Sequence, residues 1–135
     1  MLRHRVIPCL LLSGEGLVKT TRFQSPSYVG DPLNAIRIFN EKEVDELIVL
    51  DIDASRQGRA PDFNRVEQVA SECFMPLCYG GGVSSVEHAK TLFSLGVEKV
   101  SIQSAALADL RLVREIASRF GSQSVVVSID VKRNF

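Results

Sequence analysis

Short apolar runs rich in β-branched residues recur along the chain and predict buried β-strands. Runs without strict alternation of apolar and polar residues are typical of parallel strands that are covered on both faces. The sequence therefore predicts five strands spread over the whole chain. They are His4–Leu12, Asp45–Ile52, Met75–Tyr79, Glu98–Gln103 and Ser124–Asp130.

Each gap between these strands contains a segment with helical spacing of apolar residues and a recognisable start or end. Acidic and hydroxyl residues cap helix starts, proline favours the first helical position, and glycine favours the position after the end. The resulting order of alternating strands and helices predicts an α/β fold with parallel strands and right-handed crossovers. The expected starts are Asp31–Pro32, Asp62, the capping box Ser84–Glu87 and Asp109, and the expected ends are Lys42, Gly96 and Gly121.

Two segments depart from this regular alternation. Residues Ser13–Gly30 form a connection of about 18 residues, a length that is usually functional or mobile inside a compact domain. The fifth strand is followed only by Val131–Phe135, although parallel strands need cover on both faces. We therefore expect a truncated chain, or a second subunit that supplies the missing cover.

Two architectures remain open on this pattern: a flavodoxin-like open sheet, and half of a (β/α)8 TIM barrel made of (βα)4 plus a fifth strand. Arg5, Glu46 and Lys99 each begin a strand, and counting by two places them on one face of the sheet. In a barrel they would form a ring of paired charges at the amino-terminal mouth. The other interpretation is that they are ordinary surface charges at strand entrances.

Composition narrows the functional classes. The length of 135 residues predicts a single domain covering residues 1–135. The chain carries 16 Lys+Arg and 16 Asp+Glu, so its charge balance gives no indication of a basic surface that would bind nucleic acid or a membrane. No apolar run reaches the roughly 18 residues that would span a bilayer, and no signal peptide is recognisable. The three cysteines have no metal-ligand spacing, which favours reduced cysteines and no metal site. We expect a cytoplasmic protein.

Candidate chemistry gathers at the carboxyl ends of the predicted strands, where both architectures place functional sites. Gly80–Gly82 joins a strand to a capped helix, so its N–H groups could bind a phosphate, or it could be only a tight turn. Ser104, at the next strand end, could add a hydroxyl. Lys19 could reach over the site or remain a solvated loop lysine. Asp130 could act as a general acid or base, or as a cap or ion-pair partner.

Seven segments resemble the cyclase subunit of imidazole glycerol phosphate synthase, a lyase of histidine biosynthesis in the histidine/tryptophan phosphate-binding barrel group. The resemblance covers the whole chain without gaps and implies that the chain is the N-terminal half of a (β/α)8 barrel, plus strand five, with no cofactor. The segments are Arg5–Leu10, Gly16–Thr20, Gly30–Pro32, Asp45–Ser55, Tyr79–Val83, Val97–Ala106 and Arg119–Asp130.

The resemblance also implies roles for individual residues. Arg5, Glu46 and Lys99 match three of the four charged residues that gate an ammonia channel, where a glutaminase subunit docks. A phosphorylated small-molecule substrate is implied as the second partner. The matching substrate- and phosphate-site residues are Lys19, Asp51, Gly81, Gly82, Gln103 (in place of the usual Asn) and Ser104, and Asp130 matches one of two catalytic aspartates.

The position of the other catalytic aspartate holds Leu11, which cannot transfer a proton. The stretch Leu10–Thr20, together with Asp51–Ser55, more closely resembles a paralogue group linked to surface-polysaccharide genes, which is thought to deliver ammonia to a sugar amidotransferase. We therefore expect an ammonia-channelling subunit for sugar amidation. The alternatives are the cyclase of histidine biosynthesis, and a non-catalytic phosphate-binding half-barrel that assembles with itself. Open edges on strands one and five predict an isolated half that is inactive and forms a homo-oligomer.

Overall fold

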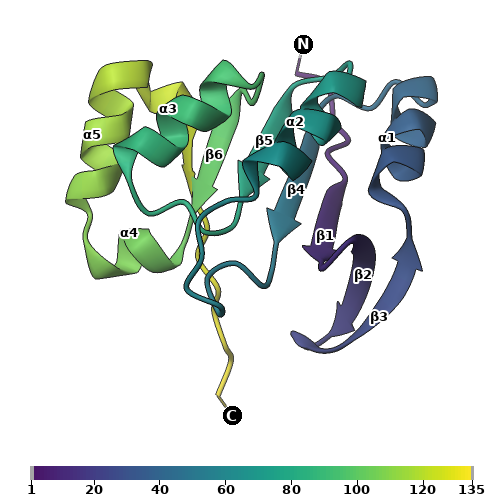
Figure 1. Ribbon diagram of the computed structural model, residues 1–135, viewed down its shortest axis with the longest axis horizontal. Coiled ribbons are helices and arrows are strands. Elements are labelled where there is room, and N and C mark those ends of the chain that lie inside the picture. Colours follow the sequence, from purple (N-terminus) through teal and green to yellow (C-terminus); the bar gives the residue numbers. More distant parts are fainter. Residues whose placement is uncertain (1, 135) are drawn as a thin grey trace.

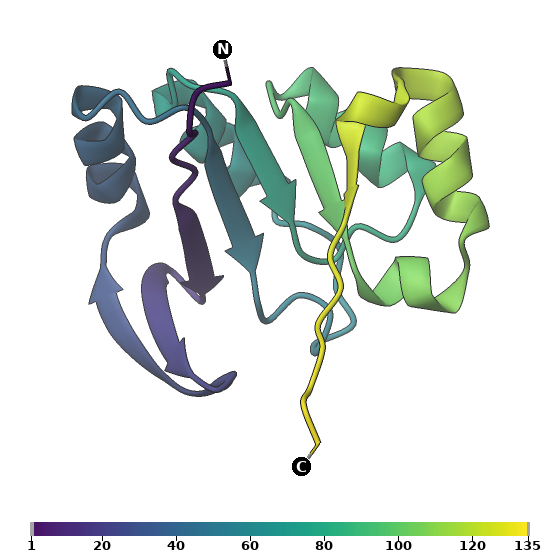
Figure 2. The ribbon, with the colours of Figure 1, turned by 180° about the vertical axis from the view of Figure 1, so that it is seen from behind.

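A computed structural model of the chain describes residues 2–134 as one sheet with its helices on one side (Figures 1 and 2). Five parallel strands lie side by side in the order in which they occur along the chain. In a flavodoxin-like sheet the third strand is added on the opposite side of the first strand from the second, so the strands do not follow chain order and that alternative is wrong. The arrangement is that of half a (β/α)8 barrel. These strands are β1 (Cys9–Ser13), β4 (Leu47–Asp51), β5 (Leu77–Gly80), β6 (Lys99–Ile102) and β7 (Val125–Val127).

Helices alternate with the parallel strands along the chain, as the sequence pattern predicts. The side chains of Asp31, Asp62 and Ser85 accept hydrogen bonds from N–H groups of the first turns of α1, α2 and α3, respectively. The last long helix begins at Arg111, two residues after the predicted start, and a short helix that was not predicted precedes it. The helices are α1 (Pro32–Glu41), α2 (Phe63–Glu72), α3 (Val86–Ser94), α4 (Ser104–Ala108) and α5 (Arg111–Phe120), with a 3-10 turn at Ser122–Ser124.

The expected loop between Ser13 and Gly30 is instead a β-hairpin, so that expectation is wrong. Strands β2 (Gly16–Thr21) and β3 (Gln24–Gly30) pair antiparallel with each other, and β2 pairs with β1. Gly14 has a φ of +59° and permits the tight turn out of β1, while the buried Leu17 anchors the hairpin to the core. Strand one is therefore not an edge of the sheet, and the two edges are β3 and β7.

The hydrophobic core lies between the sheet and its helices. Leu47, Val49 and Val100 point toward the helices and are almost fully buried. Ile48 and Leu50 alternate with them on the opposite, concave face and are only partly buried. The concave face therefore has no helices over it, as is expected for one half of a barrel wall, whose other half closes the lumen.

Candidate functional site

The amino-terminal ends of the parallel strands bring Arg5, Glu46 and Lys99 together. Glu46 Oε1 accepts a hydrogen bond from Lys99 Nζ at 3.2 Å and another from Arg5 Nη2. The Glu46 side chain is 13% exposed, and Lys99 also bonds to the exposed Glu98 at 3.3 Å. The predicted cluster is present as a geometric unit, with one carboxylate bridging two cations.

Competing effects set the protonation of this cluster. Partial burial would by itself raise the pKa of Glu46, but the hydrogen bonds from Lys99 and Arg5 outweigh it and hold that pKa below its ordinary value of 4.5. Burial would lower the pKa of Lys99, but its bonds to Glu46 and Glu98 raise that pKa above the ordinary 10.5. Both groups are therefore charged at neutral pH, and the ion pairs are maintained.

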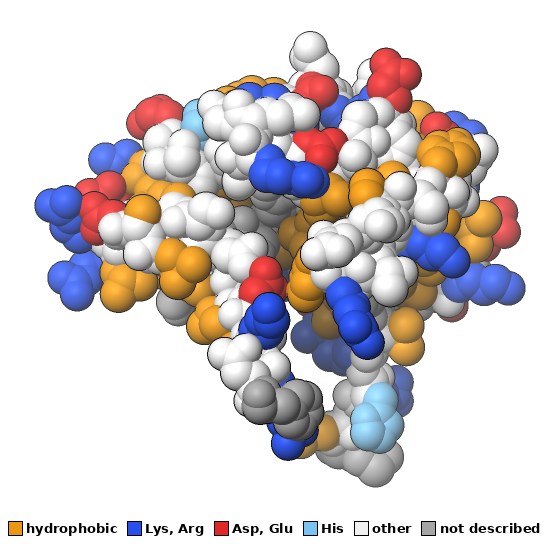
Figure 3. All heavy atoms as spheres, turned by 90° about the horizontal axis from the view of Figure 1, so that it is seen from below, with side chains coloured by type: hydrophobic (Ala, Val, Ile, Leu, Met, Phe, Trp, Pro, Cys, Tyr) orange, Lys and Arg blue, Asp and Glu red, His pale blue; other side chains and the backbone are white. Residues whose placement is uncertain are grey.

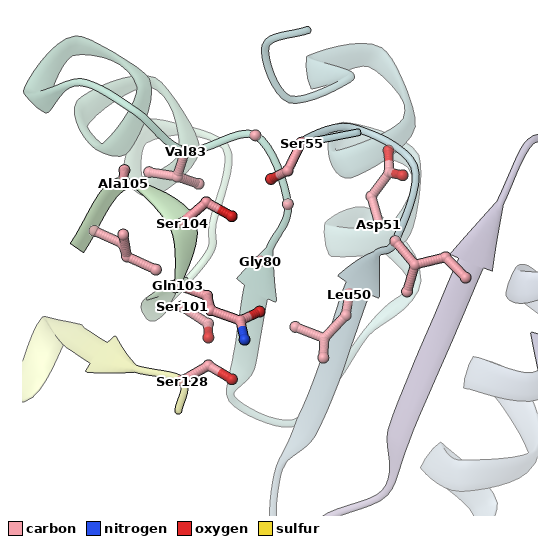
Figure 4. A pocket seen from close by; sticks show the side chains of 14 residues that line it. Leu50, Asp51, Ser55, Gly80, Val83, Ser101, Gln103, Ser104, Ala105 and Ser128 are labelled. Atoms are coloured by element: carbon pink, nitrogen blue, oxygen red, sulfur yellow. The ribbon is translucent and has the colours of Figure 1, made fainter. Parts of the chain in front are cut away.

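The carboxyl-terminal ends of the strands enclose a cavity of about 160 Å³ (Figure 4). Seen from this side, the molecule is hollowed in its middle, with hydrophobic side chains visible inside and charges of both signs around it (Figure 3). Six residues that the sequence singled out line the cavity: Asp51, Gly80, Gly81, Gly82, Gln103 and Ser104. None of the lining residues is a lysine or arginine, so an anion bound here would be held by backbone and hydroxyl groups.

Gly81 and Gly82 do more than turn the chain. Their φ angles are +122° and +74°, and a Cβ atom at either would lie 2.5 Å from a carbonyl oxygen, that of Asp51 or that of Arg59. Only glycine fits both constraints. Within residues 2–134, the N–H groups of Gly82 and Ser104 have no protein acceptor, so these donors are available to a ligand at the cavity.

The Asp51 carboxylate is engaged by the protein itself. One oxygen accepts the N–H groups of Asp53 (3.0 Å) and Ala54 (3.2 Å), and the other pairs with Arg59 at 2.8 Å. Asp53 in turn accepts hydrogen bonds from the Ser13 hydroxyl at 2.7 Å and the Gly14 N–H at 3.2 Å. The segment after β4 is thereby tied to the hairpin turn as well as to the cavity wall.

Asp130 and Lys19 lie outside the cavity lining. Asp130 is exposed in the segment after β7, and its Oδ2 accepts a hydrogen bond from Gln103 Nε2 at 2.5 Å. Lys19 is exposed on β2, one residue beyond Val18, the partner of Leu11 in the β1–β2 pairing. Leu11 itself is half-buried in β1, beside Leu50 of β4.

Three serines that were not proposed as site residues also line the cavity: Ser55, Ser101 and Ser128. The hydroxyls of Ser55 and Ser104 point toward each other across the cavity (Figure 4). Ser101 and Ser128 follow the every-second-residue spacing that placed Gln103 and Asp130 on the inner face, and this spacing could have identified them. Ser55 gives no such signal, because it lies in a turn.

Among residues 2–134, no helix is long and apolar enough to cross a membrane. The same residues contain no cluster of metal-ligating side chains that could hold an ion. The three cysteines are free thiols, with Cys9 exposed, Cys73 half-buried and Cys78 buried.

Comparison with known proteins places the chain in a family. The family model described as histidine biosynthesis protein matches residues 5–135. The chain belongs to this family. The chain is 67% identical over 135 residues to the "Putative imidazole glycerol phosphate synthase subunit hisF2" of Pseudomonas aeruginosa, covering all of this chain and 54% of the relative.

Other members carry related names. Identity is 57% over 133 residues to the hisF3 relative of Vibrio vulnificus, covering 98% of this chain and 51% of that protein. Identity is 44% over 133 residues to the imidazole glycerol phosphate synthase subunit HisF of Dictyoglomus turgidum, covering 98% of this chain and 53% of that protein. The chain therefore spans about half the length of the relatives that it matches.

Proposed function

We propose that this chain forms the N-terminal half of a cyclase-like barrel subunit in a glutamine amidotransferase system. In this proposal a glutaminase subunit docks at the amino-terminal ends of the strands and supplies ammonia. A phosphorylated small molecule binds at the carboxyl-terminal ends and receives it. The observation that carries the proposal is that an ionic cluster and a cavity with free N–H donors lie at opposite ends of the same parallel strands.

The ionic cluster has the properties of a gate. Glu46 bridges Arg5, which is exposed, and Lys99, which is held by two carboxylates. Arg5 can therefore leave while Lys99 stays paired. The strand face beyond the cluster carries Ile48 and Leu50, and neutral ammonia crosses such an apolar surface at far lower cost than ammonium.

The cavity suits the phosphate group of a substrate. The donors are the N–H groups of Gly82 and Ser104 and the hydroxyls of Ser55 and Ser104, and phosphate oxygens accept hydrogen bonds from groups of these types. We assign a substrate contact to Lys19, a place in the wall of the substrate site to Asp51 and the proton-transferring role to Asp130, on the resemblance of these positions to the cyclase family.

Two residues favour sugar amidation for surface polysaccharide over ring closure. Leu11 occupies the position of one catalytic aspartate, and Gln103 engages the carboxylate of Asp130 at 2.5 Å. Both residues reduce the acid and base chemistry available at the carboxyl-terminal ends of the strands. The second candidate, the cyclase step of histidine biosynthesis, is supported by the family match and by the 44% identity to a HisF subunit.

Complementation separates these two candidates. The full-length subunit is expressed in the cytoplasm of a strain that lacks its histidine-pathway cyclase and grows without added histidine. We expect no growth from the native sequence and at most partial growth from Leu11→Asp. Robust rescue by the native sequence would establish the histidine role and overturn sugar amidation. Copurification with a glutaminase subunit, lost in an Arg5→Glu/Lys99→Glu variant, tests the proposed partner.

The 135-residue chain by itself is proposed to be inactive and to form a homo-oligomer. β7 is an open edge with exposed Val126 and Val127, whereas the β3 edge contains Pro26, which hinders strand pairing. We expect a dimer in sedimentation at micromolar concentration and a shift toward monomer in Val127→Pro, because the Val127 N–H faces the open edge whereas that of Val126 faces β6. A well-folded monomer of the native chain at that concentration would contradict this.

A further inference from the structure

Residues 52–60, in the connection between β4 and α2, lie against the glycine residues of the cavity, and an ion pair joins Arg59 to Asp51 at the end of β4. Arg59 Nη2 lies 2.8 Å from Asp51 Oδ2, and the other oxygen of Asp51 accepts the N–H groups of Asp53 and Ala54. The Asp51 side chain is 9% exposed and that of Arg59 36%. Both oxygens of Asp51 are therefore occupied in fixing the two ends of this segment.

The main chain of the same two residues touches the glycines. The space that a Cβ atom would need at Gly81 is filled by the Asp51 carbonyl oxygen, and at Gly82 by the Arg59 carbonyl oxygen. Nearby, the buried Tyr79 hydroxyl donates a hydrogen bond to the Gly81 carbonyl at 3.2 Å. Burial raises the pKa of Tyr79 above its ordinary value, so this donor stays protonated. Gly81 and Gly82 are held by these contacts, and the Asp51–Arg59 pair joins the two residues that fill their Cβ positions.

We infer that Arg59 is a positioning residue: through Asp51 it holds residues 52–60 against Gly81 and Gly82, and so maintains the backbone conformation that binds an anion. Arg59 does not line the cavity, and it acts without touching the ligand. The inference rests on the phosphate site of the proposed function. A partly exposed ion pair contributes little to stability, so the effect of Arg59 is on geometry.

The test compares two arginines in the same segment of the 135-residue chain. Arg59→Ala removes the pair with Asp51, and the matched control Arg56→Ala removes the same charge from a side chain that is 71% exposed and pairs with Asp53 at 3.2 Å. The amide NMR signals of Gly81 and Gly82 report their conformation, and titration with inorganic phosphate reports binding. Thermal unfolding by circular dichroism checks that each variant is folded.

We expect Arg59→Ala to shift both glycine signals and to weaken phosphate binding about tenfold, whereas Arg56→Ala changes binding by less than about twofold. Arg59→Lys should recover part of the affinity, because an ammonium group can still pair with Asp51. In an Asp51→Asn background, Arg59→Ala should add little, since the two residues act as a unit. If Arg59→Ala does not fold, Arg59→Gln takes its place.

The outcomes separate this inference from the proposed function. Unchanged glycine signals in Arg59→Ala overturn the positioning role, whatever the phosphate result. Equal weakening by Arg56→Ala and Arg59→Ala also overturns it, because loss of charge alone would then account for both. A native chain that binds no phosphate removes the proposed phosphate site, and the glycine signals then decide the role of Arg59 alone.

Discussion

The two ends of the parallel strands carry different kinds of polar group. At the amino-terminal end, Glu46 bridges the cationic side chains of Arg5 and Lys99. At the carboxyl-terminal end, the cavity presents the N–H groups of Gly82 and Ser104 and serine hydroxyls, with no lysine or arginine in its lining. The charge of the amino-terminal end depends on which side chains are present, whereas anion binding at the carboxyl-terminal end depends on the absence of side chains that would displace the backbone.

The largest expected effect comes from a methyl group at the carboxyl-terminal end. Gly82→Ala forces a Cβ to within 2.5 Å of the Arg59 carbonyl oxygen, at a φ of +74°. Phosphate binding should fall at least about tenfold, since the backbone must move out of its binding conformation. Isothermal titration with inorganic phosphate measures this loss. Gly58→Ala is the matched control, because its φ is +64° and nothing lies within 4 Å of the added carbon. Equal losses in both variants would refute the steric explanation.

A smaller effect is expected from deleting a side chain at the amino-terminal end. Glu46→Ala leaves Lys99 partly buried without its main partner, and should lower the free energy of unfolding by about 1–2 kcal/mol. Chemical denaturation measures the change. Glu98→Ala removes an exposed partner of the same lysine and should cost less. Phosphate binding should be unaffected by either variant, and a loss in Glu46→Ala would show that the two ends are not independent.

The smallest effect is a pH dependence confined to the ionic cluster. The pKa of Glu46 is lower in the folded protein than its ordinary 4.5, so its contribution to stability is complete above about that pH and is lost as pH falls through the folded value. Lys99 has a raised pKa, so its contribution is complete below 10.5 and is lost above its folded value. The stability difference between the native chain and Glu46→Gln should therefore shrink below pH 4.5. A difference that stays constant down to pH 3 would contradict the ion pair.

The contrast between the two ends also explains what the sequence could predict. Period-two counting along the strands predicted that Arg5, Glu46 and Lys99 share one face, and regular strand geometry explains this for Glu46 and Lys99, which lie at the starts of β4 and β6. Arg5 lies four residues before β1, outside the strand that was predicted to contain it, and reaches the cluster through its ion pair with Glu46. That Gly81, Gly82 and Ser104 line a cavity followed from their position directly after predicted strands, because the carboxyl ends of parallel strands lie at the same edge of a sheet. The Arg59–Asp51 pair could not be found, since it depends on the path of an irregular turn that leaves no periodic signal. The hairpin was missed because Gly, Ser and Pro between Ser13 and Gly30 are typical of loops.

Each parallel strand lies beside the parallel strand that precedes it in the chain. The β2–β3 hairpin, which comes between β1 and β4 in sequence, pairs with the other side of β1. Each strand–helix unit can therefore dock on a surface that has already been synthesised, without waiting for a distant partner. Pairing of near neighbours keeps chain-closure costs low and favours rapid folding. The strand that is synthesised last, β7, lies at the edge of the sheet and pairs only with β6.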